Sequence, residues 1–432
     1  MKTKALPGFR DFYPTDLALR SHIFSTWRSV ATRYGFEEYD GPPLEPLDLY
    51  TAKSGDEIVG QLYNFTDKGE RQVALRPEMT PTLARMVAAH AGELRKPIRW
   101  FSIPQLFRYE RQQRGRLREH FQLNCDLIGE SSPLADAEVI ALAIDVMRGF
   151  GLTSSDVRVR ISDRRVLTGI LAARGVTQAG MSSAFQFIDK RERLRKSDTD
   201  NFALHPDEFG LVDVRQLQEI ADIRSWEALQ EELGRSRISQ AGEPLLQVRD
   251  ALNAMGHGDF LDLDLGIVRG LAYYTGVVFE LFDAGRTLRA ICGGGRYDNL
   301  LKELGGVDLP ALGFGMGDVV LSELLKEKGL VPGATSSIDV FLAFIGKDDL
   351  AQVLSLAHQL RDAGFRVEYA MSPQAIGKQL KLADARNARF AVVIGPDERA
   401  RGEVVVKDLR SGSQEAVPQN SVVAIIKSRL HG

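Results

Sequence analysis

The sequence contains only two cysteines, Cys125 and Cys292, among 432 residues. They lie far apart and lack the spacing of a metal site, which excludes a disulfide-rich secreted scaffold and offers no zinc site. The first residues include no apolar segment typical of a secretory signal peptide. No apolar run is long enough to span a bilayer. We therefore expect a cytoplasmic protein with no membrane partner.

Strong charge of one sign is also missing, because the formal net charge is only −3. Any surface that binds nucleic acid must therefore be local. The apolar fraction of 44% and the charged fraction of 26% are those of an ordinary globular protein. The length predicts two or three domains.

The most informative stretch runs from Gln105 to Asp126. It predicts a strand, an arginine-rich loop and a return strand. Polar and apolar residues alternate strictly along the return strand, as expected when one face of a strand is buried. The polar face carries Arg116, Arg118, His120, Gln122, Asn124 and Asp126, and the apolar face carries Leu117, Phe121, Leu123, Cys125 and Leu127.

Between Arg108 and Arg118 the same stretch places five arginines beside one acid, Glu110. A guanidinium group binds phosphate oxygens through a rigid fork of donors, so the cluster favours a polyanionic ligand. A solvated basic hairpin explains the charges equally well. The five residues are Arg108, Arg111, Arg114, Arg116 and Arg118.

The first hundred residues predict a helix that begins at Thr15 or Asp16 and ends near Tyr34. A strand over 36–44 ends in a proline pair and is plausible at a subunit interface. A hairpin over 61–75 precedes a helix that Glu78 and Thr80 open. A carboxylate there usually serves the helix dipole, although it could also bind a substrate ammonium group.

The middle of the chain predicts an inserted, mainly helical module over 163–256. Two β-rich runs then flank Arg269. The glycines 293–295 lie in a predicted strand and indicate close approach, either of a ligand or of a neighbouring strand. A glycine-rich strand next leads into a helix near Asp318, without the spacing of a dinucleotide-binding fingerprint.

Residues 331–337 have the composition of a linker, and 338–432 alternate strands and helices as a separate α/β domain does. The basic residues of this last part could contact RNA, or they could form an ordinary solvated helix face. They include Lys378, Lys381, Arg386 and Arg389.

Taken together, the motifs resemble those of the histidyl-tRNA synthetases, a class II aminoacyl-tRNA synthetase family. The stretch FRYER to RGRLRE resembles motif 2, and LRPEMT resembles the amino-acid loop. VRGLAYYTG and CGGGRYD resemble two histidine-specific signatures. The resemblance implies an α+β fold, in which residues 1–330 form an antiparallel sheet core flanked by helices and 338–432 form an anticodon-binding domain.

The resemblance further implies a histidine–tRNA ligase that acts as a homodimer on histidine, ATP with Mg²⁺, and tRNA(His). Arg108 and Arg269 would be the catalytic cations. Arg108, Glu110, Arg116 and His120 would bind ATP. The residues implied to bind histidine are Glu78, Thr80, Gln122, Asp126, Arg269, Tyr273, Tyr274 and Tyr297.

Three positions depart from the family pattern. The family usually reads REF-x-Q, and its aromatic ring stacks on adenine. Here the pair is His120–Phe121, and the alternation predicts that His120 stacks on adenine. Ala272 replaces a carboxylate. Val320 stands where motif 3 normally has an arginine for the γ-phosphate, and Arg111 or Arg114 are the candidate substitutes. The third departure is typical of a non-catalytic relative, the histidine-sensing regulatory subunit of ATP phosphoribosyltransferase, which stays the alternative function.

Overall fold

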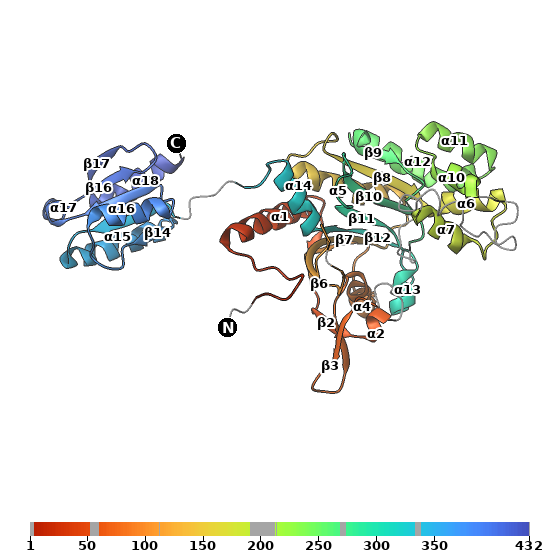
Figure 1. Ribbon diagram of the computed structural model, residues 1–432, viewed down its shortest axis with the longest axis horizontal. Coiled ribbons are helices and arrows are strands. Elements are labelled where there is room, and N and C mark those ends of the chain that lie inside the picture. The colour runs from red at the N-terminus through yellow and green to blue at the C-terminus, as the bar shows by residue number, and fades with distance from the viewer. Residues whose placement is uncertain are drawn as a thin grey trace. The chain divides into compact units, whose positions relative to one another are not determined.

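The computed structural model describes residues 4–51, 60–111, 113–190, 212, 214–267, 274–332 and 338–431. The chain forms two compact units, Met1–Val331 and Pro332–Gly432, which Figure 1 shows in red to cyan and in blue. Within the described ranges, no helix combines the length and the apolar character that crossing a membrane requires.

The first unit is organised around a nine-stranded sheet formed by the described residues. Its pairs are antiparallel except at the two ends of the strand order, where β1 pairs with β5 and β8 with β9 in parallel. The short strand β6 (Gln105–Phe107) pairs with β7 only. The other strands are, in sheet order, β1 (Glu37–Glu38), β5 (Ile98–Ser102), β7 (Glu119–Ile128), β12 (Ala311–Gly317), β11 (Cys292–Arg296), β10 (Val277–Asp283), β8 (Val157–Asp163) and β9 (Leu261–Leu263).

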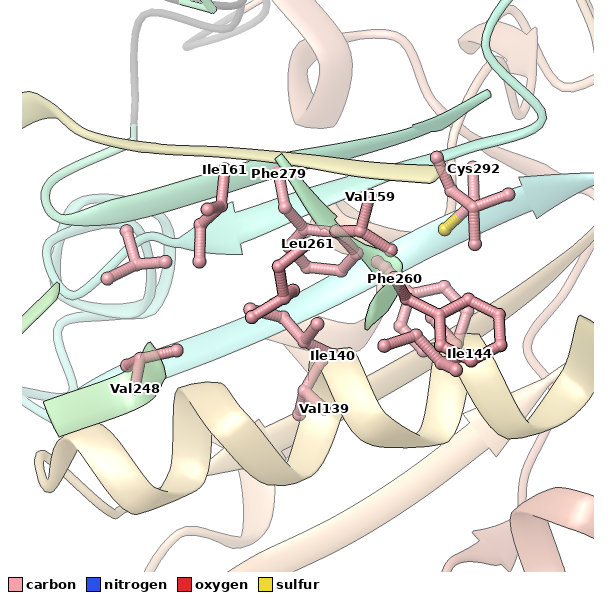
Figure 2. Packing of buried hydrophobic residues seen from close by; sticks show 14 of the residues in the cluster. Val139, Ile140, Ile144, Val159, Ile161, Val248, Phe260, Leu261, Phe279 and Cys292 are labelled. Atoms are coloured by element: carbon pink, nitrogen blue, oxygen red, sulfur yellow. The ribbon is translucent and has the colours of Figure 1, made fainter. Parts of the chain in front are cut away.

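One face of this sheet is covered by α5 (Pro133–Gly149), whose side chains form the centre of the main core. Figure 2 shows Ile140 and Ile144 of α5 directed toward Val159 and Phe279 of the sheet. The helices α1 (Pro14–Arg33) and α14 (Asp318–Glu327) contribute to the same core. The expected α+β core with flanking helices is confirmed, and the parallel edge pairs make its sheet a mixed one.

Apart from Asp163, the last residue of β8, the regular elements described within the segment predicted as a helical module are all helices. The helix α12 packs against both α5 and α6 and so joins this segment to the core. The helices are α6 (Arg164–Arg174), α7 (Met181–Lys190), α10 (Val214–Ala221), α11 (Trp226–Arg235) and α12 (Ser239–Ala254).

A small three-stranded sheet and α4 (Thr80–His90) lie beside the large sheet (Figure 1). The predicted hairpin is present as β3 (Tyr63–Thr66) and β4 (Gln72–Leu75). The single strand predicted over 36–44 is wrong. Because its two prolines supply no backbone N–H, the segment divides into β1 and β2 (Leu44–Pro46), which belong to different sheets. The short helix α2 (Asp48–Thr51) lies between β2 and β3 in the chain. The helix α13 (Leu300–Gly305) packs against α4.

The second unit has a five-stranded sheet with its own apolar core. Its strands are β14 (Val367–Tyr369), β13 (Val340–Phe344), β15 (Phe390–Ile394), β16 (Glu403–Asp408) and β17 (Gln414–Pro418), in sheet order. The sequence pattern did not predict the strand β17 or the helix α17 (Pro396–Arg401). The helices are α15 (Leu350–Asp362), α16 (Ile376–Ala385), α17 (Pro396–Arg401) and α18 (Val422–His431).

Candidate active site

The strand β7 separates a polar face from the core. Its odd-numbered residues Leu123, Cys125 and Leu127 belong to the main apolar core. The side chains of Gln122 and Asp126 lie on the opposite face, above glycines of the neighbouring strand β12. A Cβ atom on Gly313 would come within 2.3 Å of Asp126 Oδ1, and one on Gly315 within 2.6 Å of Gln122 Cδ. Glycine is therefore required in β12 so that both polar side chains can lie flat across it.

Asp126 and Tyr297 form a deeply buried polar pair on this face. The hydroxyl of Tyr297 donates a hydrogen bond to Asp126 Oδ1, and both residues are at most 4% exposed. Burial raises the pKa of the Asp126 carboxyl to about 7, and the hydrogen bond from Tyr297 opposes this shift. Asp126 therefore changes its charge close to neutral pH. It can present to a ligand either a carboxylate acceptor or a neutral carboxyl group.

Two further tyrosines surround this pair. Tyr274 is buried in the same apolar cluster as Tyr297, and a Cβ on Gly295 would lie 3.1 Å from its ring. Burial, and after it the charge of Asp126, raise the pKa of the Tyr39 hydroxyl well above its usual range. Arg269, Ala272 and Tyr273 lie outside the described residues.

Arg108 links the end of β6 to the loop that precedes α4. Its Nε donates to the carbonyl of Pro77 at 2.9 Å, and its side chain is partly buried. The next residue, Glu78, is 6% exposed, and Thr80 begins α4. Leu83, Ala84 and Val87 of α4 pack into the cluster that holds Tyr274 and Tyr297. Glu78 and Thr80, the residues expected to bind the ammonium group, thus lie between Arg108 and the cluster that holds Tyr274 and Tyr297.

The arginine-rich loop turns back at Gly115, whose φ of +74° is a left-handed conformation that favours glycine. The return strand begins at Glu119, not at Arg116 as the alternation predicted, because the N–H groups of Arg118 and Glu119 both donate to Gly8 O. Arg116 therefore lies in the loop, where its Nη1 is 3.0 Å from Glu110 Oε2. Its placement beside Gln122 and Asp126 on one strand face was wrong.

His120 and Phe121 lie in different surroundings. The ring of Phe121 packs against Phe24 of α1 at a centroid distance of 5.2 Å, with the Arg20 guanidinium 4.9 Å above it. His120 is partly buried, and burial, followed by the charges of Arg108 and Arg10, lowers its pKa to about 3. His120 is thus a neutral ring close to Arg108. Stacking of this ring on adenine stays a prediction.

Sequence reasoning missed a partly buried ion-pair network formed by Arg10. Its Nε donates to Glu119 at 2.6 Å and its Nη1 to Asp318 at 2.9 Å. Asp318 in turn accepts from the backbone N–H of Phe121 at 2.9 Å. The network ties the N-terminal segment to β7 and to the start of α14. The only local signal was an acid at a helix start, a pattern that is common and unspecific.

A second missed pair lies under β11. Arg296 is 2% exposed and its Nη2 donates to Asp136 of α5 at 2.6 Å. Its Nη1 also donates to Asp298 at 3.2 Å, and Asp298 accepts from Thr275. These contacts fix the chain on both sides of Tyr297. They explain how that tyrosine is held against Asp126.

Comparison with known proteins identifies the family of this chain. The family model described as histidyl-tRNA synthetase matches residues 8–318, and the model described as anticodon binding domain matches residues 339–429. A histidine–tRNA ligase of Opitutus terrae is 45% identical over 98% of this chain and 98% of its own length. One from Thermoplasma volcanium is 38% identical over 99% of both chains.

Comparison with solved structures indicates the same family. The crystal structure of a histidyl-tRNA synthetase from a Nostoc species superimposes with a TM-score of 0.82 at 26% identity, covering 99% of this chain and 100% of that one. Sequence and fold thus agree along the whole length of the chain. The chain therefore belongs to the histidyl-tRNA synthetase family and is an aminoacyl-tRNA synthetase.

Proposed function

We propose that the protein activates histidine with ATP to form histidyl-adenylate and then transfers histidine to the 3′ end of tRNA(His). In the first step a carboxylate oxygen of histidine attacks the α-phosphorus and pyrophosphate leaves. In the second step a ribose hydroxyl attacks the acyl carbon and AMP leaves. The observation that carries the proposal is the buried Asp126–Tyr297 pair beside Gln122, in the same sheet region as Arg108.

We propose that Asp126 accepts a hydrogen bond from the imidazole N–H of the substrate. A buried carboxylate is a strong acceptor, and a substrate without this donor would leave it unpaired, which gives selectivity. Gln122, Tyr274 and Tyr297 shape the same place. Glu78 and Thr80 would bind the substrate ammonium group, while Tyr273 and Arg269 complete the histidine site by the family pattern alone.

For ATP we propose that Arg108 holds the α-phosphate and the histidine carboxylate together. Its Nε is occupied by Pro77 O, which fixes the direction of the side chain. Positioning and charge stabilisation are what this displacement requires, because no covalent nucleophile takes part. Arg269 would add a second cation. Glu110 and Arg116, which form an ion pair, would contact the nucleotide with His120 at the base.

Magnesium is expected to enter with ATP. Among the described residues, no group of three or more His, Cys, Asp or Glu side chains is arranged to hold a metal ion. Mg²⁺ commonly retains several waters and binds through substrate phosphates, so ATP itself would supply its main ligands. Glu78, Glu110 and Asp126 are the acids that this proposal places near the substrates.

The second unit is proposed to bind the anticodon arm of tRNA(His). Lys378 and Lys381 are exposed on α16 and are free to meet phosphates. Arg389 is 2.7 Å from Asp408, and Arg386 is 3.6 Å from Glu368, so these two arginines are partly neutralised. We also propose a cytoplasmic homodimer, with α1 and the proline-containing segment near residue 42 at its interface.

Histidine-dependent exchange of pyrophosphate into ATP tests the proposal. The synthetase requires exchange that depends on histidine and a separate transfer of labelled histidine to tRNA(His). Tight histidine binding without exchange would instead support the regulatory-subunit alternative. Absence of both would leave only RNA binding by the second unit, which filter binding of tRNA(His) would measure.

A substitution in β12 tests the position of Gln122. Gly315→Ala places a methyl group against the Gln122 side chain. The side chain must then leave its rotamer, at a cost of about 0.5–1.5 kcal/mol, so the KM for histidine should rise about two- to tenfold. The KM for ATP should change less than about twofold, and both are measured by pyrophosphate exchange.

Gly317→Ala is the matched control, because a Cβ at this position of the same strand meets no atom within 4 Å. Its backbone φ of −82° also accommodates alanine. Equal KM values for histidine in Gly315→Ala and wild type would remove Gln122 from the histidine site. Thermal unfolding of both variants separates this result from a general loss of folding.

A further inference from the structure

A hollow of about 330 Å³ lies where three distant segments meet. The arginine-rich loop contributes Gln113, Arg114 and Gly115, and the helix α14 contributes Val320 and Glu323. The third wall is residues 287–289, which connect β10 to β11. The hollow therefore adjoins the loop to which we assign ATP binding. Its residues are polar and charged apart from Leu288, Gly115 and Val320.

Arg289 and Val320 lie side by side at this hollow. A Cβ built on Gly115 would be 3.2 Å from Val320 Cγ2 and 3.6 Å from Arg289 Cδ. The Arg289 side chain thus runs past the bare backbone of Gly115 next to Val320. Its Nη2 reaches the Gln113 side chain, donating to Oε1 at 2.5 Å. The guanidinium group is therefore directed toward the arginine-rich loop.

The position of Arg289 distinguishes it from Arg111 and Arg114, the two loop arginines that are the other candidate cations. Arg114 is held by two acids of α14, with contacts of 3.1 Å to Glu323 and 2.5 Å to Glu327. Its charge is balanced by these partners, and so is that of Glu323 in the hollow wall. Arg111 is exposed and forms no ion pair within the described part of the chain. Arg289, in contrast, lies beside Val320 and directs Nη2 at the Gln113 side chain of the loop.

We infer that Arg289 supplies the cation that contacts the β- and γ-phosphates of ATP, in place of the arginine expected at the position of Val320. The inference rests on the proposed ATP site in the adjacent loop. An arginine offers a planar fork suited to two phosphate oxygens, and a small valine beside it leaves room for that fork. The cation comes from the β10–β11 connection rather than from α14, and it reaches the same hollow.

Arg289→Ala tests this assignment in pyrophosphate exchange. We expect the KM for ATP to rise about tenfold, as the loss of a hydrogen bond to a charged group implies, with the KM for histidine changed less than about twofold. Binding of AMP, which lacks the β- and γ-phosphates, should be unchanged. An equal loss of AMP and ATP binding would place Arg289 elsewhere and would overturn the inference.

The double variant Arg289→Ala/Val320→Arg provides a readout that a merely structural role would not give. An arginine at position 320 of α14 should restore most of the ATP affinity.

Arg111→Ala is the competing single variant. If it raises the KM for ATP while Arg289→Ala does not, Arg289 is not the cation. If the wild type performs no exchange, the proposed function is wrong. The inference is tested separately, because it is refuted if Arg289→Ala binds ATP as tightly as the wild type.

Discussion

Replacing Arg108 by alanine is expected to lower kcat/KM for histidine-dependent pyrophosphate exchange by about 10²–10³-fold, the usual effect of removing one preorganised donor from a developing oxyanion. The guanidinium is held by Pro77 O, directly before Glu78, so it is oriented before the substrates bind. Its charge should act mostly on the transition state, where negative charge grows on the α-phosphate. The loss should therefore appear largely in kcat.

Two variants give this experiment its contrast. Arg108→Lys keeps the charge but loses the planar fork, so its activity should lie between the wild type and Arg108→Ala. Arg71→Ala removes an exposed arginine that pairs with Asp67 in the β3–β4 turn, and it should retain full activity. An exchange rate within about threefold of the wild type for Arg108→Ala would take Arg108 out of the catalytic site.

A readout independent of catalysis is the titration of His120. The charge of Arg108 contributes, after burial, to lowering the pKa of His120 to about 3. Removing that charge should move the pKa of His120 upward, toward its ordinary value, which NMR of the ring protons measures. No movement would mean that the two side chains are farther apart than we infer.

Alternation along β7 was predictable because a strand with one buried face must place every second residue in the core. The prediction failed at Arg116, where the chain is not yet in the strand. The strand does not extend to Arg116 because the carbonyl of Gly8 accepts hydrogen bonds from the N–H groups of Arg118 and Glu119. Such a contact joins segments about a hundred residues apart and leaves no local trace in the sequence.

The periodicity of the sequence also could not predict which residues contact the site residues. Tyr297 lies 171 positions from Asp126, and Arg10 lies 308 positions from Asp318. Only the family resemblance suggested Tyr297, and nothing suggested Arg10. The strand β17 was missed for another reason. Four of its five residues are exposed, so backbone pairing with β16 rather than an apolar face holds it in the sheet.

Histidine recognition is expected to depend strongly on pH through Asp126, whose carboxyl has a pKa of about 7 because it is buried. Between pH 6 and pH 8 the carboxylate fraction rises from about one tenth to about nine tenths. The KM for histidine should fall up to about tenfold over this range. Free histidine titrates in the same region, so the wild type must be compared with a variant that lacks the Asp126 charge.

Asp126→Asn is that variant. It should raise the KM for histidine about 100-fold above the wild-type value at pH 8, because a buried charged acceptor is lost, and this ratio should fall to about tenfold at pH 6. The KM for ATP should stay within about twofold of the wild type. A ratio of variant to wild-type KM that is the same at both pH values would exclude Asp126 as the titrating acceptor.

The titration of Asp126 should change the stability of the protein in the direction opposite to its effect on histidine binding. The raised pKa means that the folded protein holds a proton that the unfolded chain releases near pH 4. The stabilisation is fully present below that pH and is lost as the pH rises through about 7. Without ligand, the wild type should therefore lose more thermal stability than Asp126→Asn between pH 6 and pH 8. Added histidine should offset this loss at pH 8 in the wild type only, because it binds the charged form. A wild type and variant that respond alike to pH and to histidine would mean that Asp126 neither titrates in this range nor contacts the imidazole.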